Sequence, residues 1–330
     1  MPPVMIPHPA APAFLAANGW GGAAILSLAG DASFRRYFRA VDGNRTAVLM
    51  DAPPDTEDSR PFLAIAAHLN GLGFAAPRAL AADLDLGLIL LDDFGDRRVA
   101  PVLAADPSGE RAVYEAAIDI LAALHGHVPP DIAPYGPAEL HREVGILAEW
   151  YAPAVSLDMA SGYAAAWDAV LGGVIAETEA APVLVLRDYH ADNLMILDRP
   201  GLQRLGLLDF QDALAGHPAY DLVSLLQDAR RDIDPALEAA MLDRYTASRG
   251  ISDPAAFRAS YEVLGAQRNA KILGVFARLW KRDGKPGYRQ FQPRVWGYLE
   301  RNLAHPALAP VRDWFDANVP AAKRAAAWHP

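Results

Sequence analysis

The 330-residue chain contains no cysteine. This absence excludes disulfide bonds, thiolate nucleophiles, zinc–thiolate sites and iron–sulfur clusters. Lysine is also scarce, since the chain has four lysines and the first of them is Lys271. Chemistry that depends on a lysine amine is therefore excluded from residues 1–270.

The chain also lacks long apolar runs and a positive net charge. No apolar run approaches the roughly 20 residues of a transmembrane helix, and residues 1–14 have no basic segment ahead of an apolar stretch, as a signal peptide would. Thirty basic and 40 acidic residues give a formal charge of −10, which disfavours a globally basic nucleic-acid-binding protein. We therefore predict a cytoplasmic protein that binds neither a membrane nor nucleic acid.

The residues that are present predict a folded α+β protein, because 52% are hydrophobic and only 21% are charged. The first part contains strand patterns around the turn Asp42-Gly43-Asn44, which is typical of a hairpin. It also contains one helical pattern over 61–72. After Asp92–Asp96 the pattern is mostly helical. The helices that it predicts cover 138–150, 161–179, 217–231, 235–248, 254–283 and 305–318.

A short strand island interrupts the helical part and carries three polar residues. Asp188 follows the predicted strand Val183–Leu186. Asn193 opens a hairpin, whose strands we place at 194–197 and 205–208, and Asp209 closes it. The ends of adjacent strands can therefore bring the three side chains together.

Such a cluster needs a functional reason, because gathering acids at strand ends seldom stabilises a fold. A divalent cation is one reason. Mg²⁺ prefers oxygen ligands and often uses one or two side chains together with substrate phosphates. The third group would then be available to accept a proton.

The spacing resembles the protein-kinase-like superfamily, and most closely its aminoglycoside phosphotransferase branch. In that branch a His-Gly-Asp loop is followed by an Asn five residues after the Asp, and here Leu186-Arg187-Asp188 is followed by Asn193. The metal-binding Asp of the branch follows a hairpin, as Asp209 does here. The resemblance implies that Asp188 is the catalytic base and that Asn193 and Asp209 are Mg²⁺ ligands.

The resemblance also implies a two-lobed, protein-kinase-like α+β fold. A small β-rich N-lobe over residues 1–94 would bind ATP, with a hinge near 90–94. A larger, mostly helical C-lobe over 95–330 would carry the catalytic loop and the substrate site. Asp221, in His217–Leu222, would begin a helix that supports the catalytic loop, and we interpret it as an anchor and not as a catalyst.

The phosphate-binding end departs from the kinase pattern, because no lysine exists in the N-lobe. Gly30–Ser33 can supply backbone N–H groups and a hydroxyl to a phosphate. An arginine must replace the lysine, and guanidinium groups bind phosphate well. The candidate nucleotide-binding residues are Ser33, Phe34, Arg35 and Arg36 near the loop, with Arg39 and Arg45 as further options, and Leu91 and Asp93 in the hinge that would hold the adenine.

The acceptor is predicted to be a small molecule. Asp209 and Asp221 are 12 positions apart, which is too short for the activation segment with which protein kinases dock peptides. Residues 263–298 carry eight basic residues and a single acid, Asp283, which favours an anionic acceptor. The candidate substrate-binding residues are Asp192, Gln211, Asp212, Arg268 and Lys271.

The whole chain most resembles the N-acetylmuramate/N-acetylglucosamine anomeric kinases of cell-wall recycling. The resemblance rests on Gly30–Tyr37, Met50–Pro54, Leu186–His190 and Gln267–Lys271, which occur in this order. It implies phosphorylation of the anomeric hydroxyl of an amino sugar with ATP and Mg²⁺. The alternatives are a kinase of the same fold for another small sugar or an amino alcohol, and a non-catalytic nucleotide-sensing pseudokinase. We expect a monomer.

Overall fold

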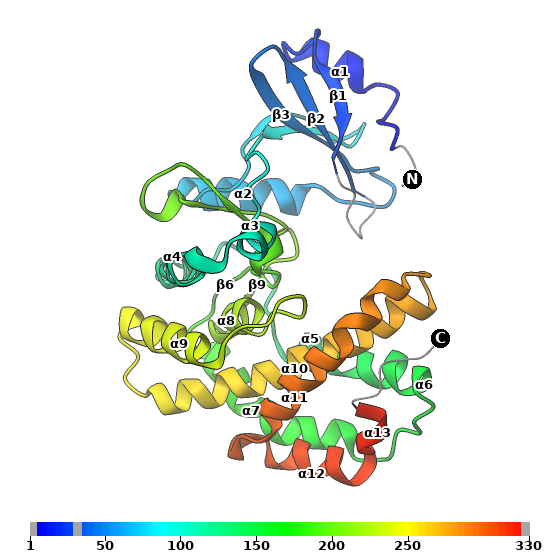
Figure 1. Cartoon of the computed structure of the whole chain (residues 1–330), viewed down its shortest axis with the longest axis vertical. Coiled ribbons are helices and arrows are strands. Elements are labelled where there is room, and N and C mark those ends of the chain that lie inside the picture. The colour runs from blue at the N-terminus through cyan, green and yellow to red at the C-terminus, as the bar shows by residue number, and fades with distance from the viewer. Residues whose placement is uncertain (1–4, 29–34, 325–330) are drawn as a thin grey trace. The chain divides into compact units, whose positions relative to one another are not determined.

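The computed structural model describes residues 5–28 and 35–324, so the predicted nucleotide-binding residues Ser33 and Phe34 lie outside the described residues. The chain divides into two compact units (Figure 1). Unit 1 comprises residues 1–107 and 192–212, and unit 2 comprises residues 108–191 and 213–330. The functional boundary that we predicted near residues 90–94, between a nucleotide-binding lobe and a substrate-binding lobe, stays a prediction. Within the described residues, no helix is both long and apolar enough to span a membrane.

Unit 1 is built on an antiparallel sheet with the strand order β1-β2-β3-β5-β4. Its strands are β1 (Ala24–Ser27), β2 (Arg36–Asp42), β3 (Arg45–Asp51), β4 (Ala79–Asp83) and β5 (Leu88–Asp92). The predicted hairpin at Asp42-Gly43-Asn44 is confirmed, since Gly43 has a φ of 59° and Asp42 pairs with Arg45 across the turn. A left-handed φ of this kind favours glycine.

One face of this sheet packs on the helix α1 (Ala11–Ala17). Alternating residues of β2, β3 and β5 point into this core, as the two-residue period of a strand requires. Its buried members include Phe14, Leu15, Phe38, Leu49 and Leu90. The other helices of unit 1 are α2 (Arg60–Gly71) and α3 (Val99–Ala105).

The predicted hairpin after Asn193 is also confirmed, and it belongs to unit 1. Its strands are β7 (Leu194–Ile196) and β8 (Leu205–Leu207). The Leu207 N–H donates to the carbonyl of Ala75 at 2.8 Å, and the Ile196 N–H donates to the carbonyl of Arg97 at 2.7 Å. These backbone bonds fix both ends of the hairpin to the rest of unit 1.

Unit 2 is mostly helical. Its helices are α4 (Glu110–Leu124), α5 (Pro137–Ile146), a π-helical continuation (Leu147–Tyr151), α6 (Ala152–Ala154), α7 (Tyr163–Ala180), α8 (Ala219–Leu226), α9 (Pro235–Arg249), α10 (Pro254–Lys281), α11 (Gln292–Leu303), α12 (Ala309–Asn318) and α13 (Ala321–Arg324). The strands β6 (Val183–Val185) and β9 (Leu214–Gly216) pair antiparallel. Short 3₁₀ turns occupy Pro286–Phe291 and Pro306–Leu308.

The long helix α10 is the centre of unit 2, and it contacts α5, α7, α8 and α11 (Figure 1, yellow to orange). Its first turn is capped by Asp253, whose carboxylate accepts a hydrogen bond from the Ala256 N–H at 2.9 Å. Gly274 permits the close approach of α5, because a Cβ there would lie 2.4 Å from the carbonyl oxygen of Ile146. The helix thereby carries side chains from the core of unit 2 to the loop that carries Asp188.

The predicted helices are present, but one of our predictions was wrong in detail and one helix was missed. The pattern over 217–231 predicted a longer helix than α8, which ends at Leu226. The chain turns there, and the Asp228 carboxylate accepts a hydrogen bond from the Arg230 N–H at 2.8 Å. The helix over Gln292–Leu303 was not among the predicted helices; Pro293 lies in the first turn of this helix, α11.

Candidate active site

The loop that carries Asp188 follows β6 and is anchored from beneath by Asp221. The Asp221 carboxylate is fully buried and accepts hydrogen bonds from the Leu186 N–H at 2.7 Å and the Arg187 N–H at 2.8 Å. Burial raises the pKa of Asp221 to about 7, against these two N–H donors, which lower it. The prediction that Asp221 anchors the loop that carries Asp188 is confirmed.

The loop holds Arg187 in a left-handed conformation with a φ of 69°, which is unusual for a residue with a side chain. The Ser224 hydroxyl donates to the Arg187 carbonyl at 3.0 Å. Strained backbone of this kind persists only where its surroundings fix it, and it is concentrated at functional sites. The anchors from α8 therefore set the direction in which Asp188 leaves the loop.

The Asp188 side chain is 46% exposed and lies among positive charges. One guanidinium nitrogen of Arg268 is 3.9 Å from its Oδ1. Desolvation would raise the pKa of Asp188, but its electrostatic interactions with His190, Lys271 and Arg268 outweigh it and hold that pKa below its ordinary value. The carboxylate is therefore ionised at neutral pH, as a proton acceptor must be.

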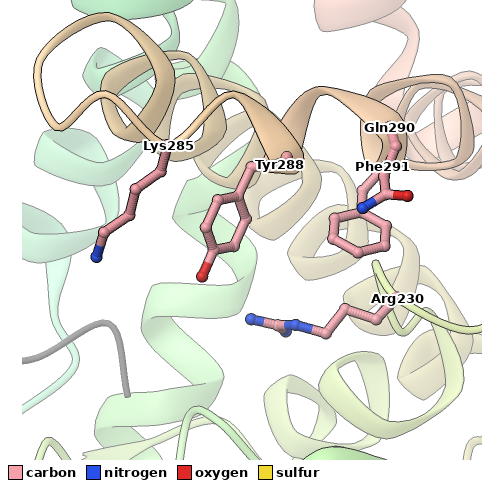
Figure 2. A pocket seen from close by; sticks show the side chains of 6 residues that line it. Arg230, Lys285, Tyr288, Gln290 and Phe291 are labelled. Atoms are coloured by element: carbon pink, nitrogen blue, oxygen red, sulfur yellow. The ribbon is translucent and has the colours of Figure 1, made fainter. Parts of the chain in front are cut away.

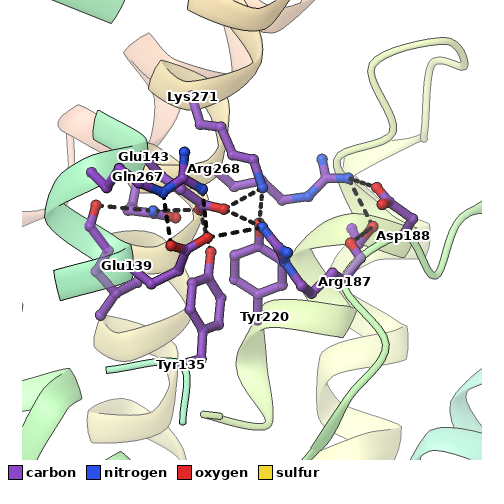
Figure 3. A network of polar contacts seen from close by, with 12 residues as sticks. Tyr135, Glu139, Glu143, Arg187, Asp188, Tyr220, Gln267, Arg268 and Lys271 are labelled. Carbon is purple, nitrogen blue, oxygen red and sulfur yellow. Dashed lines mark hydrogen bonds and ion pairs between the residues drawn. The ribbon is translucent and has the colours of Figure 1, made fainter. Parts of the chain in front are cut away.

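Lys271 joins a buried network centred on Glu143 of α5 (Figure 3). Its Nζ lies 2.6 Å from Glu143 Oε1 and 3.3 Å from the Tyr220 hydroxyl. Glu143 also accepts hydrogen bonds from the Tyr135 hydroxyl, from Arg187 and, at 3.0 Å, from Gln267. Desolvation opposes the charge of Glu143, yet Lys271 and Arg187 lower its pKa to about 2.

Arg268 lies one helical turn from Lys271 on α10 and is buried. Its Nη2 donates to the Ser224 hydroxyl at 2.8 Å, and Ser224 in turn donates to the Arg187 carbonyl in the loop that carries Asp188. The structure thus brings Arg268 and Lys271 to the same network as Asp188, with defined protein partners for both. Their predicted contact with substrate stays a prediction.

Asn193 and Asp209, the predicted metal ligands, meet in unit 1. The Asn193 amide donates to Asp209 Oδ2 at 3.3 Å. Asp209 has a left-handed φ of 59°. The next residue, Phe210, is buried and stacks on Phe62 of α2 with ring centroids 5.2 Å apart. This packing fixes the segment that presents the Asp209 carboxylate.

The donor set at this point fits Mg²⁺. An amide oxygen and a carboxylate are hard oxygen ligands, and Mg²⁺ commonly uses one or two side chains together with phosphate oxygens. In the part of the chain that is described, no group of three or more His, Asp or Glu side chains is placed to hold a metal ion by itself. Gln211 steadies the carboxylate, because its Nε2 donates to Asp209 Oδ1 at 2.9 Å and lies 3.4 Å from Asp212 Oδ2.

Arg35 is the buried member of the predicted phosphate-binding arginines. Its Nε lies 3.5 Å from Glu57 Oε2. Desolvation would lower the pKa of Arg35, but Tyr37, Asp209 and Glu57 raise it above the ordinary value. The Arg35 charge therefore acts directly on the segment that carries the predicted metal ligand.

The other arginines of this sheet have acidic partners of their own. Arg36 pairs with Asp51 at 2.8 Å. Arg39 Nε lies 2.7 Å from Asp93 Oδ2, and Asp93 Oδ1 also accepts a hydrogen bond from the Gly95 N–H at 2.8 Å. Arg45 pairs with Asp42 at the hairpin turn.

The remaining predicted residues of unit 1 have clear places but untested roles. Leu91 is buried in β5, and Asp192 lies in a 3₁₀ turn over Ala191–Asn193. Sequence reasoning missed Glu57 and Glu143, which no motif marks. Glu143 is noticeable only as a carboxylate on the buried face of a helix. That face is recognisable only once α5 packs on α10.

Comparison with known proteins gives a consistent result. The phosphotransferase enzyme family matches residues 24–259. The chain belongs to this family. Among relatives of this phosphotransferase, a protein of Caulobacter vibrioides named N-acetylmuramate/N-acetylglucosamine kinase is 41% identical over 94% of this chain and 96% of its own. A Pseudomonas aeruginosa protein of the same name is 38% identical over 90% of each chain.

Solved structures show the same protein-kinase-like α+β fold for this phosphotransferase. Choline kinase LicA from Streptococcus pneumoniae aligns with a TM-score of 0.56, at 14% identity, over 87% of this chain and 93% of its own. Aminoglycoside phosphotransferase APH(3'')-Id from Streptomyces rimosus, in complex with ADP and streptomycin, aligns with a TM-score of 0.52, at 20% identity, over 79% of this chain and 98% of its own. The predicted fold class is confirmed.

Proposed function

We propose that this phosphotransferase transfers the γ-phosphoryl group of ATP to the anomeric hydroxyl of N-acetylmuramate or N-acetylglucosamine. The observation that carries the proposal is the near full-length similarity, at 35–41% identity, to four proteins that are named kinases of these two sugars. The anchored loop of Asp188 in unit 2 and the contact of Asn193 with Asp209 in unit 1 each support it. The product would be the sugar 1-phosphate.

On the acceptor side, Asp188 is the proposed base. Its carboxylate accepts the proton of the anomeric hydroxyl as that oxygen forms a bond to the γ-phosphorus. The bond from the γ-phosphorus to the bridging oxygen breaks, and ADP leaves. The lowered pKa of Asp188 keeps the carboxylate ionised before the reaction, and the anchors from Asp221 fix its position.

On the nucleotide side, Asn193 and Asp209 are the proposed holders of Mg²⁺. When bound, the cation neutralises charge on the phosphates. Gln211 holds one oxygen of Asp209 in place, and the stacking of Phe210 on Phe62 keeps the strained backbone fixed. Both contacts orient the carboxylate before the nucleotide arrives.

Arg35 is our choice for the role that a lysine has in most kinases. It is buried, it pairs with the carboxylate of Glu57, and its charge acts on Asp209. A guanidinium held by an acid in this way would contact the ATP phosphates as the lysine–glutamate pair of kinases does. Arg36 and Arg39 have other acidic partners, which supports the choice of Arg35.

The other proposed contacts follow the family resemblance. The segment around Leu91 and Asp93 would hold the adenine, with Ser33 and Phe34 at the phosphates. Asp192, Gln211, Asp212, Arg268 and Lys271 would line the approach of the amino sugar. Of these, Arg268 is supported by its distance of 3.9 Å from Asp188.

The test is an ATP-turnover assay with a panel of acceptors. The panel contains N-acetylmuramate, N-acetylglucosamine, glucose, choline and an aminoglycoside, and the products are identified by phosphorus NMR. We expect 1-phosphates of the two N-acetylated sugars. Turnover with choline or glucose alone would contradict the proposed acceptor class, and nucleotide binding without turnover of any acceptor would point to a sensor.

The same assay tests the proposed base through Asp188→Asn. We expect turnover to fall by about three orders of magnitude or more, because the amide cannot accept the proton. Nucleotide affinity, measured by calorimetry with ADP and Mg²⁺, is expected to stay within a few-fold. Turnover like that of the unmodified protein would overturn the assignment of Asp188.

A further inference from the structure

A pocket of about 330 Å³ opens between the loop that joins α8 to α9 and the 3₁₀ turn Pro286–Phe291 of unit 2 (Figure 2). Its volume falls in the range of small-ligand sites, about 300–1,000 Å³. Six residues line it: Arg230, Lys285, Gly287, Tyr288, Gln290 and Phe291. Sequence reasoning did not find this pocket, because Arg230 lies far in sequence from the turn that completes it.

The lining combines two cations with two aromatic rings. Figure 2 shows the side chains of Lys285, Tyr288 and Arg230 directed toward the same space. None of the six lining residues is acidic. Phe276 of α10 supports the aromatic wall, with its ring centroid 5.3 Å from Tyr288 and 5.9 Å from Phe291. The pocket therefore offers flat apolar faces together with a positive electrostatic potential.

Arg230 connects this pocket to the catalytic loop. Its Nη1 lies 3.4 Å from His190 Nε2, and His190 is buried two residues after Asp188. Because a guanidinium can only donate, the neutral imidazole accepts this bond. Burial, the strongest influence on this group, lowers the pKa of His190 and so favours the neutral ring. Arg230 would therefore contact both a ligand in the pocket and the loop that carries Asp188, the proposed base.

The pocket contains one cation of the basic segment over residues 263–298, Lys285. Several other cations of this segment are paired within the protein, as Lys271 is with Glu143, Arg282 with Asp283 and Arg294 with Asp232. Lys285 lines the pocket, and Arg230, which lies outside the segment, lines it as well. The pocket thus brings one cation of the basic segment together with a second cation from outside it.

We propose that Arg230 and Lys285 recognise the carboxylate of an anionic sugar acceptor, while Tyr288 and Phe291 contact the apolar face of its ring. This inference rests on the proposed function and refines it. Of the two sugars in the names of the relatives, N-acetylmuramate carries a carboxylate and N-acetylglucosamine does not. The pocket therefore sets the preference between them and has no part in the transfer step itself.

The test compares kcat/KM for the two sugars in Lys285→Gln and Arg230→Gln. Each variant removes one charged contact to a carboxylate, which is worth about tenfold to a hundredfold in binding. We expect the ratio of kcat/KM for N-acetylmuramate to that for N-acetylglucosamine to fall at least about tenfold in each variant. Lys285→Arg, which keeps the charge, is expected to restore most of the ratio.

Lys281→Gln is the matched control, because Lys281 lies four residues earlier and rests on the Trp280 ring at 3.6 Å, outside the pocket. We expect the ratio to stay the same in this variant. An unchanged ratio in both Lys285→Gln and Arg230→Gln, with both sugars still phosphorylated, would overturn the pocket assignment alone. Failure of the unmodified protein to phosphorylate either sugar would instead overturn the proposed function.

Discussion

At the residue scale, the choice of Arg35 makes a direct prediction. Arg35→Gln removes the charge that acts on Asp209 and leaves Glu57 without its partner. We expect the KM for ATP to rise about tenfold to a hundredfold, as for the loss of a charged hydrogen bond. Arg35→Lys is expected to recover part of the loss. Steady-state kinetics with ATP as the varied substrate provide the measurement.

The control for this variant is Arg60→Gln in the same unit. Arg60 pairs with Asp58 at 2.8 Å, and its side chain is 77% exposed. An exposed pair of this kind contributes about 1 kcal/mol or less, so the KM for ATP is expected not to change. Equal effects of the two substitutions would contradict the special role of Arg35.

Glu143 supports a second residue-scale prediction, this time about stability. Glu143→Gln leaves the charges of Lys271 and Arg187 without their shared buried partner. Breaking a buried ion pair in this way costs about 3–5 kcal/mol, so we expect a clearly lower melting temperature at pH 7. The control is Glu139→Gln on the same helix, since Glu139 is 25% exposed and 3.5 Å from Arg187. That substitution is expected to cost about 1 kcal/mol or less.

The loss of stability in Glu143→Gln depends on pH, because the pKa of Glu143 differs between the folded and unfolded states. Folding lowers that pKa from an ordinary 4.5 to about 2. The folded state therefore binds fewer protons than the unfolded state between these values, and the stabilisation is present above pH 4.5 and lost as the pH falls toward 2. The gap in melting temperature between the unmodified protein and Glu143→Gln is expected to be widest above pH 5 and to narrow in acid. A gap that widens in acid would contradict this sign.

The residues of the site divide into those that a sequence can show and those that it cannot. Asp188, Asn193 and Asp209 are visible because their spacing is set within one short stretch of chain. Glu57 and Arg230 are not visible, because their partners are distant in sequence. Glu57 pairs with Arg35, and Arg230 lines a pocket together with residues 285–291. Lys271 was singled out as a substrate contact, which stays a prediction, and its fully buried partner Glu143 became evident only in the packed helices.

At the scale of elements, the close contact of α10 with the end of α5 makes a prediction about packing. Gly274→Ala would place a Cβ 2.4 Å from the backbone oxygen of Ile146, which cannot move aside without shifting the π-helical segment. Overpacking of this kind costs about 1–3 kcal/mol. We expect the melting temperature to fall by several degrees in differential scanning calorimetry.

The matched control is Gly297→Ala in α11. A Cβ at Gly297 would meet nothing within 4 Å, and alanine favours a helix interior over glycine by about 1 kcal/mol. We expect the melting temperature to stay the same or to rise. A similar loss in both variants would show that α10 and α5 do not pack as closely as the structure indicates.

The elements themselves were largely predictable from periodicity and turn residues. The hairpin at Gly43 and the helix α9 each follow from local signals, such as a glycine turn and the Asp234 cap. The exception is instructive, because Pro293 suggests a break but in fact lies in the first turn of α11. A proline in the first turn of a helix follows a non-helical segment, whereas a proline that ends a helix follows a helical one.

At the scale of the whole molecule, two electrostatic effects act on an anionic acceptor. The formal charge of −10 repels it at long range, whereas the cations of the pocket attract it at short range. Screening acts over about 8 Å at 0.15 M salt and about 3 Å at 1 M. The long-range repulsion is therefore already weak at 0.15 M, and the pocket attraction weakens only at higher salt.

We accordingly expect the preference for N-acetylmuramate over N-acetylglucosamine to decline as salt rises from 0.15 to 1 M. The measurement is kcat/KM for both sugars in increasing KCl, with the uncharged sugar as the internal control for effects on the nucleotide. A ratio that does not depend on salt would contradict an electrostatic origin of the preference.

The distribution of lysine has one more consequence for the whole molecule. All four lysines (Lys271, Lys281, Lys285 and Lys323) belong to unit 2. An amine-acylating reagent therefore finds no lysine to modify in unit 1, and each modified lysine in unit 2 is identified by a distinct peptide mass. Protection of Lys285 by a bound sugar can be followed in this way on the unmodified protein, while the exposed Lys281 reports the intrinsic reactivity of the reagent.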